Sequence, residues 1–349
     1  MTLHNEILEQ PDRLEQLIVT HRKTVEAIAR AIHTRDIQYV FLAARGTSDN
    51  AGRYANYLWG AMNGLPLALA TPSLFTYYRR PPKLKGALLV GISQSGQSPD
   101  IVSVLEEGKR QGQPTLAITN DPGSPLAQAA DFILDLQVGE ERAIAATKTY
   151  TAELTAIAML SAAMTAVMTG EEEAWQALVQ VPGWARQVLK NEAEIARAAR
   201  RYRDMRQCVV LGRGYNYATA FEWALKLEEL TYVLAYPYSP ADFQHGPIAL
   251  LEPGFPVLAV VPSDATLASF LPLLGQIVKD VKAELLVISD SKEALDVAKY
   301  GLRTPEGVPE WITPIVNIIP AQLFSYHLAD QKGYDTEKPR GLKKVTLTR

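Results

Sequence analysis

The serine-rich loop GISQSGQSPD, residues 91–100, has the residue types of an anion-binding site. It follows an apolar run and precedes a helical pattern, so we expect it at the carboxyl end of a strand and the amino end of a helix. Free backbone N–H groups and the helix dipole favour an anion there. Gly91 and Gly96 would let the backbone approach a ligand closely. Four side chains would add polar contacts: Ser93, Gln94, Ser95 and Ser98.

The kind of anion follows from the pattern of this loop. It has no lysine followed by serine or threonine, as a nucleotide-binding P-loop has, and no G-x-G-x-x-G pattern. Hydroxyls and amides without a metal-binding partner suit a terminal monophosphate. The simpler alternative is that Ser98 only caps the helix. A second loop follows the preceding strand, where Gly46, Thr47 and Ser48 could contact the same ligand or cap the next helix.

The helical segment FEWALKLEELTY carries candidate acid–base groups. Glu222, Lys226 and Glu229 are spaced i, i+4 and i+7, which places them on one helix face. Taken alone, such a face is more often an exposed row of salt bridges. The segment follows LGRG at a predicted strand end, however, and sheets of this type place their sites there.

A histidine and a basic tail complete the candidate residues. His245 lies in the loop SPADFQHGP, and an imidazole can donate and accept protons near neutral pH, as the opening of a cyclic hemiacetal requires. The tail EKPRGLKKVTLTR is typical of a solvated, mobile chain end. If it folds over a site, Lys343 or Lys344 could form a Schiff base or hold negative charge. The other histidines are expected to be structural or unpartnered: His4, His21, His33 and His327.

Short apolar runs alternate with helical patterns, which predicts βαβ units and a parallel sheet covered on both faces. The predicted strands are Tyr39–Ala44, Ala87–Ile92 and Thr115–Thr119 in the first half, and Cys208–Leu211, Val257–Val261 and Leu285–Ser289 in the second.

The two halves resemble each other in order and spacing. Ala44-Arg45-Gly46 matches Gly212-Arg213-Gly214, Gly86 matches Gly254, and Ile118 matches Ile288, at offsets of about 168 to 170 residues. A duplicated α/β domain is therefore predicted, with the first domain at 25–170, the second at 200–330 and a tail at 331–349. Residues 171–206 are interpreted as a charged amphipathic helix that connects the domains. The second half lacks the serine pattern, so one phosphate site per chain is expected.

Composition excludes several classes of protein. The 349 residues are 47% hydrophobic and 21% charged with a formal net charge of -3, so neither nucleic acid nor an anionic membrane is an expected partner. Cys208 is the single cysteine, which rules out an intrachain disulfide. The polar N-terminus is unlike a secretory signal, and the apolar stretch Leu154–Met168 is interpreted as a core or subunit-contact helix. A cytoplasmic location is therefore expected.

Six motifs in order resemble the tandem SIS (sugar isomerase) domain family, as found in the isomerase part of glutamine–fructose-6-phosphate amidotransferase. They are ARGTSDNAG, GISQSGQSPD, GEERAIAATKTY, LGRGYNYATAFEWALKLEEL, DFQHGPIAL and PRGLKKVTLT. The resemblance implies two flavodoxin-like three-layer sandwiches, a sugar phosphate as ligand, and no cofactor or metal. It implies phosphate and sugar contacts from Ser48, Ser93, Gln94, Ser95 and Ser98, with Ile144 and Thr147 near the sugar.

The resemblance also implies catalytic roles. Glu229 matches the base that moves a proton between C1 and C2, and Lys226 matches the lysine that stabilises the enediolate. His245 matches a ring-opening histidine that the neighbouring subunit contributes, so a homodimer is implied. Lys344 matches the tail lysine that meets the open-chain carbonyl.

One departure bears on the reaction. The family's synthases carry an N-terminal glutaminase domain, whereas the printed sequence reaches its first strand within about 40 residues. We therefore expect no glutamine hydrolysis, and stand-alone SIS-type glucosamine-6-phosphate deaminases are the nearer resemblance. The expected reaction converts glucosamine 6-phosphate to fructose 6-phosphate and ammonia, or runs in reverse. The alternatives are an isomerase, deaminase or deglycase for another amino-sugar phosphate, a glutaminase-less aminotransferase-like isomerase, and a phosphosugar sensor.

Overall fold

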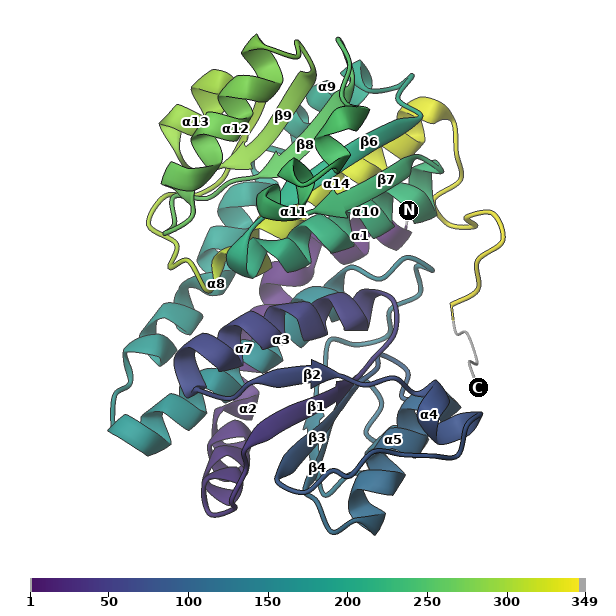
Figure 1. Cartoon of the computed structure of the whole chain (residues 1–349), viewed down its shortest axis with the longest axis vertical. Helices are drawn as coiled ribbons and strands as arrows, with labels where there is room; N and C mark the ends of the chain where they lie inside the picture. Colours follow the sequence, from purple (N-terminus) through teal and green to yellow (C-terminus); the bar gives the residue numbers. More distant parts are fainter. Residues whose placement is uncertain (1, 345–349) are drawn as a thin grey trace. The chain divides into compact units, whose positions relative to one another are not determined.

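The computed structural model describes residues 2–344, which divide into two compact units. The first-half unit contains residues 12–141, 148–180 and 343–344, and the second-half unit contains residues 2–11, 142–147 and 181–342. Each unit holds one five-stranded parallel sheet (Figure 1). Each unit is therefore built from stretches that are distant in sequence.

The first-half sheet has the strand order β2-β1-β3-β4-β5. Its strands are β1 (Tyr39–Ala43), β2 (Leu67–Leu69), β3 (Ala87–Ile92), β4 (Thr115–Thr119) and β5 (Phe132–Asp135). Helices from the same unit are α2 (Gln10–His33), α3 (Thr47–Asn63), α4 (Ser73–Thr76), α5 (Pro99–Arg110), α6 (Pro125–Ala129) and α7 (Lys148–Thr169). Apolar side chains of α4, α5 and α6 pack on one face of the sheet, and α3 packs on α7.

The second-half sheet repeats this topology, with the order β7-β6-β8-β9-β10. Its strands are β6 (Gln207–Gly212), β7 (Leu234–Tyr238), β8 (Pro256–Val260), β9 (Glu284–Ser289) and β10 (Tyr300–Arg303). Its helices are α1 (Thr2–Leu8), α9 (Glu192–Arg201), α10 (Tyr217–Thr231), α11 (Pro240–Gln244), α12 (Leu267–Lys279), α13 (Lys292–Val297) and α14 (Thr313–Lys332), with 3-10 turns at Gly214–Asn216 and Pro247–Leu250. One face is covered by α11, α12 and α13, while α14 packs against both α9 and α10.

Strand register confirms the predicted duplication. Phe41 pairs with Leu89 in the first sheet, and Val209 pairs with Val257 in the second, both shifted by 168 positions. The matched glycines also share a left-handed backbone: φ is 53° at Gly46 and 58° at Gly214. Glycine adopts a positive φ without strain, which explains why both halves carry glycine at this position.

The six predicted strands are the inner strands of the two sheets, and they agree with the structure to within one residue at each end. The four strands that the sequence did not predict are β2, β5, β7 and β10, which lie at the sheet edges. Three of the edge strands have only three or four residues, and all four include exposed positions, so they lack the fully buried apolar run that marks a central strand.

Two segments that the sequence predicts to be helical are residues 171–206 and the apolar stretch Leu154–Met168. Residues 171–206 form two helices, α8 (Glu173–Leu189) and α9, so the single connecting helix was wrong. Helix α7 is long and apolar enough to cross a membrane, but 78% of its most apolar window is buried inside the structure. It is therefore a core helix, as expected.

Candidate active site

The serine loop lies at the carboxyl end of β3 and the amino end of α5, where the sequence placed it. Ser98 occupies the N-cap position, but its side chain makes no capping hydrogen bond. Ser93 Oγ accepts a hydrogen bond from the Gly96 N–H at 3.1 Å, which tightens the turn. Among the described residues, the backbone N–H groups of Gln94, Ser95 and Ser98 have no acceptor. Free donors at a helix amino terminus suit an anion.

The two glycines of the loop are required for close packing. Gly96 has φ of 60°, and a Cβ atom there would lie 2.1 Å from Ser124 Oγ. A Cβ atom on Gly91 would lie 2.8 Å from Leu126 and 2.9 Å from Leu105. Ser124 caps α6 through the Ala127 N–H. The glycines therefore let α5 and α6 pack closely on β3, and their approach to a ligand stays a prediction.

An ion pair joins the two loops at this sheet edge. The Arg45 guanidinium, just after β1, lies 2.9 Å from the Asp100 carboxylate in the first turn of α5. Asp100 is fully buried, while about half of the Arg45 side chain is exposed. The Asp100 carboxylate also accepts a hydrogen bond from the Ile101 N–H at 3.0 Å. Arg45 therefore links the loop after β1 to α5 without adding net charge beside the serine loop, a role that the sequence did not reveal.

The polar side chains of the loop after β1 do not cap helix α3. Helix α3 begins at Thr47, its N-cap is Gly46, and that N-cap makes no side-chain bond. Ser48 is buried, and its hydroxyl donates to Glu153 of α7 at 2.8 Å. Neither Thr47 nor Ser48 is the helix cap. The Ser48 hydroxyl instead connects α3 to α7.

A hollow of about 610 Å³ opens beside the serine loop, within the first-half unit. Its walls come from the carboxyl ends of β3, β4 and β5 and from the segment before α7; they include Gln94, Asn120, Asp135, Gln137 and Glu141. Glu141 is buried and accepts from the Thr149 N–H at 3.1 Å and the Thr149 hydroxyl at 2.8 Å, so it caps α7. Lys344 lies 2.7 Å from the same carboxylate. The tail lysine is thus held at the rim of this hollow rather than free in solvent.

The equivalent loop of the second half is occupied by its own carboxylates. The Ala265 N–H donates to Glu310 at 3.2 Å, and the Ser263 N–H donates to Asp290 at 2.8 Å. The pKa of Asp264 is raised by burial and further by the Glu310 and Asp290 carboxylates. Protein anions therefore take the place that a phosphate would need, which favours a single anion site per chain.

Helix α10 carries a buried cluster of charge. Lys226 and Glu222 are fully buried, and the Lys226 ammonium lies 3.4 Å from the Glu222 carboxylate. The same ammonium forms an ion pair with Glu229, whose side chain is 22% exposed. The alternative of an exposed row of salt bridges is therefore wrong. One buried cation serves two carboxylates, and only Glu229 of the three is open to solvent.

His245 lies at the C-cap of α11 and is exposed. Its imidazole has no hydrogen-bond partner among residues 2–344. The next residue, Gly246, has φ of 150°, and this turn presents the ring outward. The prediction that the loop presents the imidazole, rather than burying it, agrees with this placement.

Comparisons with known proteins agree with the geometry. The SIS domain family model matches residues 35–163 and 201–329. The chain belongs to the SIS domain family. It is 33% identical over 342 residues to glutamine–fructose-6-phosphate aminotransferase of Aquifex aeolicus and 34% identical over 359 residues to that of Gloeobacter violaceus. These alignments cover 97% and 98% of this chain but 56% and 58% of the relatives, so the chain spans little more than half of their length.

Solved structures extend this SIS assignment. The C-terminal domain of glucosamine-fructose-6-phosphate aminotransferase from Francisella tularensis superposes with a TM-score of 0.87 at 28% identity, covering 97% of this chain and 98% of that one. A glucosamine-6-phosphate deaminase from Thermotoga maritima has a TM-score of 0.80 at 19% identity, covering the whole of both chains. That second likeness shows the fold alone.

Two expected sugar contacts lie in the GEERAIAATKTY motif of this SIS protein. Ile144 is half-buried and Thr147 is buried, and both belong to the second-half unit. The Thr147 carbonyl accepts a hydrogen bond from Gln322 of α14 at 3.3 Å. This bond anchors the segment before α7 to the core of the second-half unit.

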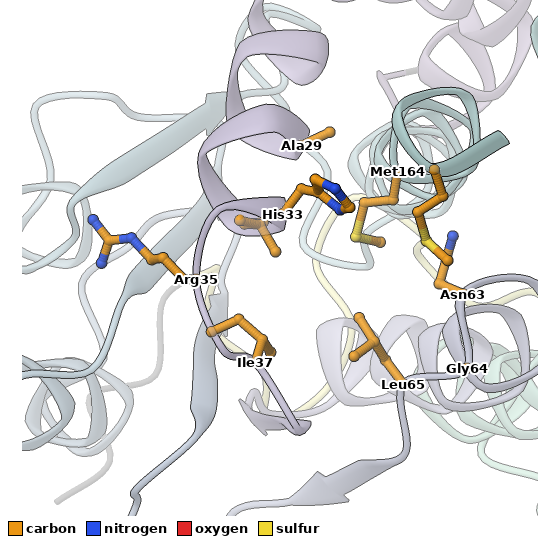
Figure 2. Close-up of a pocket in the computed structure, with 10 residues that line it drawn as sticks. Ala29, His33, Arg35, Ile37, Asn63, Gly64, Leu65 and Met164 are labelled. Atoms are coloured by element: carbon orange, nitrogen blue, oxygen red, sulfur yellow. The ribbon is translucent and has the colours of Figure 1, made fainter. Parts of the chain in front are cut away.

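A second hollow, of about 280 Å³, is lined by none of the residues of the serine loop. Figure 2 shows the residues that line it. Ile37 and Leu65 on its wall precede β1 and β2, so it opens at the amino ends of the strands. Met164 and His33 line it from the last turns of α7 and α2. Ligands in sheets of this type bind at the carboxyl ends. This hollow therefore forms no part of the candidate active site.

Proposed function

We propose that this SIS protein is a phosphosugar isomerase and deaminase that converts glucosamine 6-phosphate and water to fructose 6-phosphate and ammonia, or catalyses the reverse. The observation that carries the proposal is Lys226, a fully buried ammonium that forms ion pairs with Glu222 and Glu229 on one helix face. Burying an ion pair costs free energy that apolar residues would not incur, so its presence within α10 favours a functional role. The names of the relatives and of the Francisella tularensis domain support this substrate class.

In the proposed mechanism, proton transfer belongs to α10. The Glu229 carboxylate removes the proton from C2 of the open-chain amino sugar, and electron density shifts onto the C1 oxygen. The Lys226 ammonium compensates that oxyanion, which gives an enolamine. The C1 oxygen takes a proton from the Lys226 ammonium, and Glu229 returns its proton to C1, which leaves an iminium group at C2. Water adds to C2 and gives one proton back to Lys226, and the resulting carbinolamine loses ammonia to form the ketose phosphate.

Two other predicted residues, His245 and Lys344, would act on the sugar ring and on the C1 carbonyl. His245 would open the sugar ring by protonating the ring oxygen and accepting the proton of the C1 hydroxyl. Because its exposed ring lies at a turn, we propose that it acts in the site of a second copy in a homodimer. Lys344 would meet the C1 carbonyl from the tail.

Phosphate binding is assigned to the first-half unit. The unbonded N–H groups of the serine loop and the hydroxyls of Ser95 and Ser98 support this assignment. Gly46, Thr47 and Ser48 would complete the cradle, with Ser48 exchanging its bond to Glu153 for the ligand. Ile144 and Thr147 would contact the sugar. We also propose that the enzyme works in the cytoplasm without a cofactor.

Ammonia release from glucosamine 6-phosphate tests the proposal, with Glu229→Gln as the variant and Glu228→Gln as its matched control. Glu228 is the next residue on α10 and is exposed. We expect Glu229→Gln to lower kcat by roughly 10² to 10⁴, as loss of a general base does, and Glu228→Gln to stay near the wild-type rate. Activity that survives Glu229→Gln would refute the proposed base.

A panel of hexosamine 6-phosphates in the same assay separates the alternatives. Turnover of a different epimer would change the substrate, whereas solvent deuterium entering C1 or C2 without ammonia release would indicate isomerisation alone. Tight binding of every sugar without any turnover would indicate a sensor and overturn the enzyme proposal.

A further inference from the structure

Three helices of the second-half unit bring two imidazoles to one carboxylate. His4 of α1 places Nε2 2.7 Å from Glu192 Oε1, and His327 of α14 places Nε2 2.9 Å from the same oxygen. Glu192 is the first residue of α9. The three ligand atoms lie within 4.8 Å of one another. Residues 135 and 188 positions apart in the chain therefore converge on a single point.

This donor set is that of a divalent metal site. Two imidazole nitrogens and one carboxylate oxygen are a common three-ligand set for zinc, with water in the fourth position. We propose that His4, Glu192 and His327 bind a Zn²⁺ ion that fastens α1 to α9 and α14. The proposal is independent of the sugar-phosphate site, and the ion would link the three helices with its fourth position left to water.

The two nitrogen–oxygen distances fit after a small adjustment. Ligand atoms around tetrahedral zinc stand about 3.3 Å apart, because each bond is about 2.0 to 2.2 Å long. The observed nitrogen–oxygen separations are a few tenths of an ångström shorter, and rotation of the glutamate side chain can lengthen them. The side chains are 26%, 27% and 18% exposed in the order His4, Glu192, His327. An ion and its water can therefore enter from solvent.

The Tyr326 ring positions one of the proposed ligands. It stacks on the His4 imidazole with a centroid distance of 4.9 Å and an interplanar angle of 22°, which limits rotation of the His4 ring.

A bound ion would act on the N-terminal helix. Helix α1 has only seven residues, too few to be stable alone. Its first N–H groups are already capped, because the Thr2 N–H donates to Glu337 at 2.8 Å. A metal at His4 would add a second attachment on the next turn.

Zinc titration of the full chain tests the proposal. Protein made without a polyhistidine tag and dialysed against chelator is titrated with Zn²⁺ by calorimetry, and with Co²⁺ by visible absorption. We expect one ion per chain, a visible Co²⁺ band, and a melting temperature that rises by about 5 °C at saturating zinc. His4→Ala, His327→Ala and Glu192→Gln should each weaken binding at least tenfold.

The control variant is His33→Ala, which removes a histidine from the hollow at the amino ends of the strands. It should bind zinc as the wild type does. His4→Gln, which keeps a polar side chain on α1, replaces His4→Ala if the latter fails to fold. Absence of binding at micromolar zinc, or binding that the His4 and His327 variants leave unchanged, overturns the proposal in favour of two plain hydrogen bonds.

Discussion

The Lys344 ammonium lies 2.7 Å from the Glu141 carboxylate, and both residues belong to the first-half unit. Glu141 is fully buried and also caps α7, so this lysine is tied to a fixed point rather than to a surface side chain. The neighbouring Lys343 is exposed. The two lysines of the tail thus have different environments and should behave differently when replaced.

Replacing Lys344 should therefore affect both the chain end and the reaction. We expect Lys344→Met to speed trypsin cleavage at the remaining Lys343 several-fold, because the ion pair that holds the tail is lost. It should also lower kcat/KM by at least tenfold if the lysine meets the carbonyl. Lys343→Met is the control and should alter turnover less than twofold. Equal effects of the two substitutions would show that the pair with Glu141 has no role.

Ser98 and Ser291 both stand at helix N-caps but should respond in opposite ways. Ser291 accepts from the Ala294 N–H, so Ser291→Ala should cost about 1 kcal/mol of unfolding free energy. Ser98 makes no such bond, so Ser98→Ala should change stability by less than about 0.5 kcal/mol. Ser98→Ala should raise the KM for the sugar phosphate roughly tenfold or more, because a hydrogen bond to a charged group is worth about 1.5 to 3 kcal/mol. Urea titration and steady-state kinetics measure the two effects. A stability loss at Ser98 equal to that at Ser291 would instead indicate a capping role.

Gly96 and Gly112 both have a left-handed backbone, with φ of 60° and 72°. A Cβ atom on Gly112 meets nothing within 4 Å, whereas one on Gly96 would overlap Ser124 Oγ. Gly112→Ala should cost about 1 kcal/mol from the backbone alone. Gly96→Ala should cost about 1 to 3 kcal/mol more, and it should weaken binding of inorganic phosphate because the loop must move. Chemical denaturation and calorimetry check this, and equal losses for the two variants would contradict it.

Cys208 offers a pH-dependent probe of the second-half core. Burial raises the pKa of this thiol well above its ordinary range, with a smaller contribution from the Glu228 carboxylate. Above about pH 8.5 the unfolded chain loses the thiol proton while the folded chain keeps it. Stability should therefore fall as pH rises through this range, and Cys208→Ala should show a shallower decline between about pH 8 and 10. A thiol reagent should label the native protein only as fast as it opens. Rapid stoichiometric labelling of the folded chain would contradict this burial.

The central strands could be predicted because burial on both faces demands uninterrupted apolar runs, as in ALLVGI of β3. The edge strands carry no such demand. The serine loop could likewise be located, because strand, turn chemistry and helix pattern coincide there. The offset of about 168 positions followed from one matched tripeptide and two matched single residues. The positive φ of Gly46 and Gly214 explains why both halves carry glycine at that one position.

The contacts that the sequence could not predict join residues that are far apart along the chain. The partners of His4 and His327 meet at Glu192 only once α1, α9 and α14 are packed. The hydrogen bond from the Ala265 N–H to Glu310 could not be predicted for the same reason, because the two residues are 45 positions apart in the sequence. The burial of Lys226 was also hidden, because an i, i+4, i+7 spacing specifies a face but not what covers it.

The interleaving of the two units restricts how the chain can be divided. A cut within α8 would leave an N-terminal fragment that carries α1 and residues 142–147 without the core they belong to. It would also remove Lys344 from the fragment that contains Glu141. Neither fragment would contain a whole unit. Expressing the two halves separately should therefore give fragments that aggregate. Mixing the fragments would be needed to combine each sheet with its missing segments. To separate the duplicated domains genetically, a cut within α8 would not be enough. Residues 2–11 and 142–147 would also have to be joined to the second half, and residues 343–344 to the first.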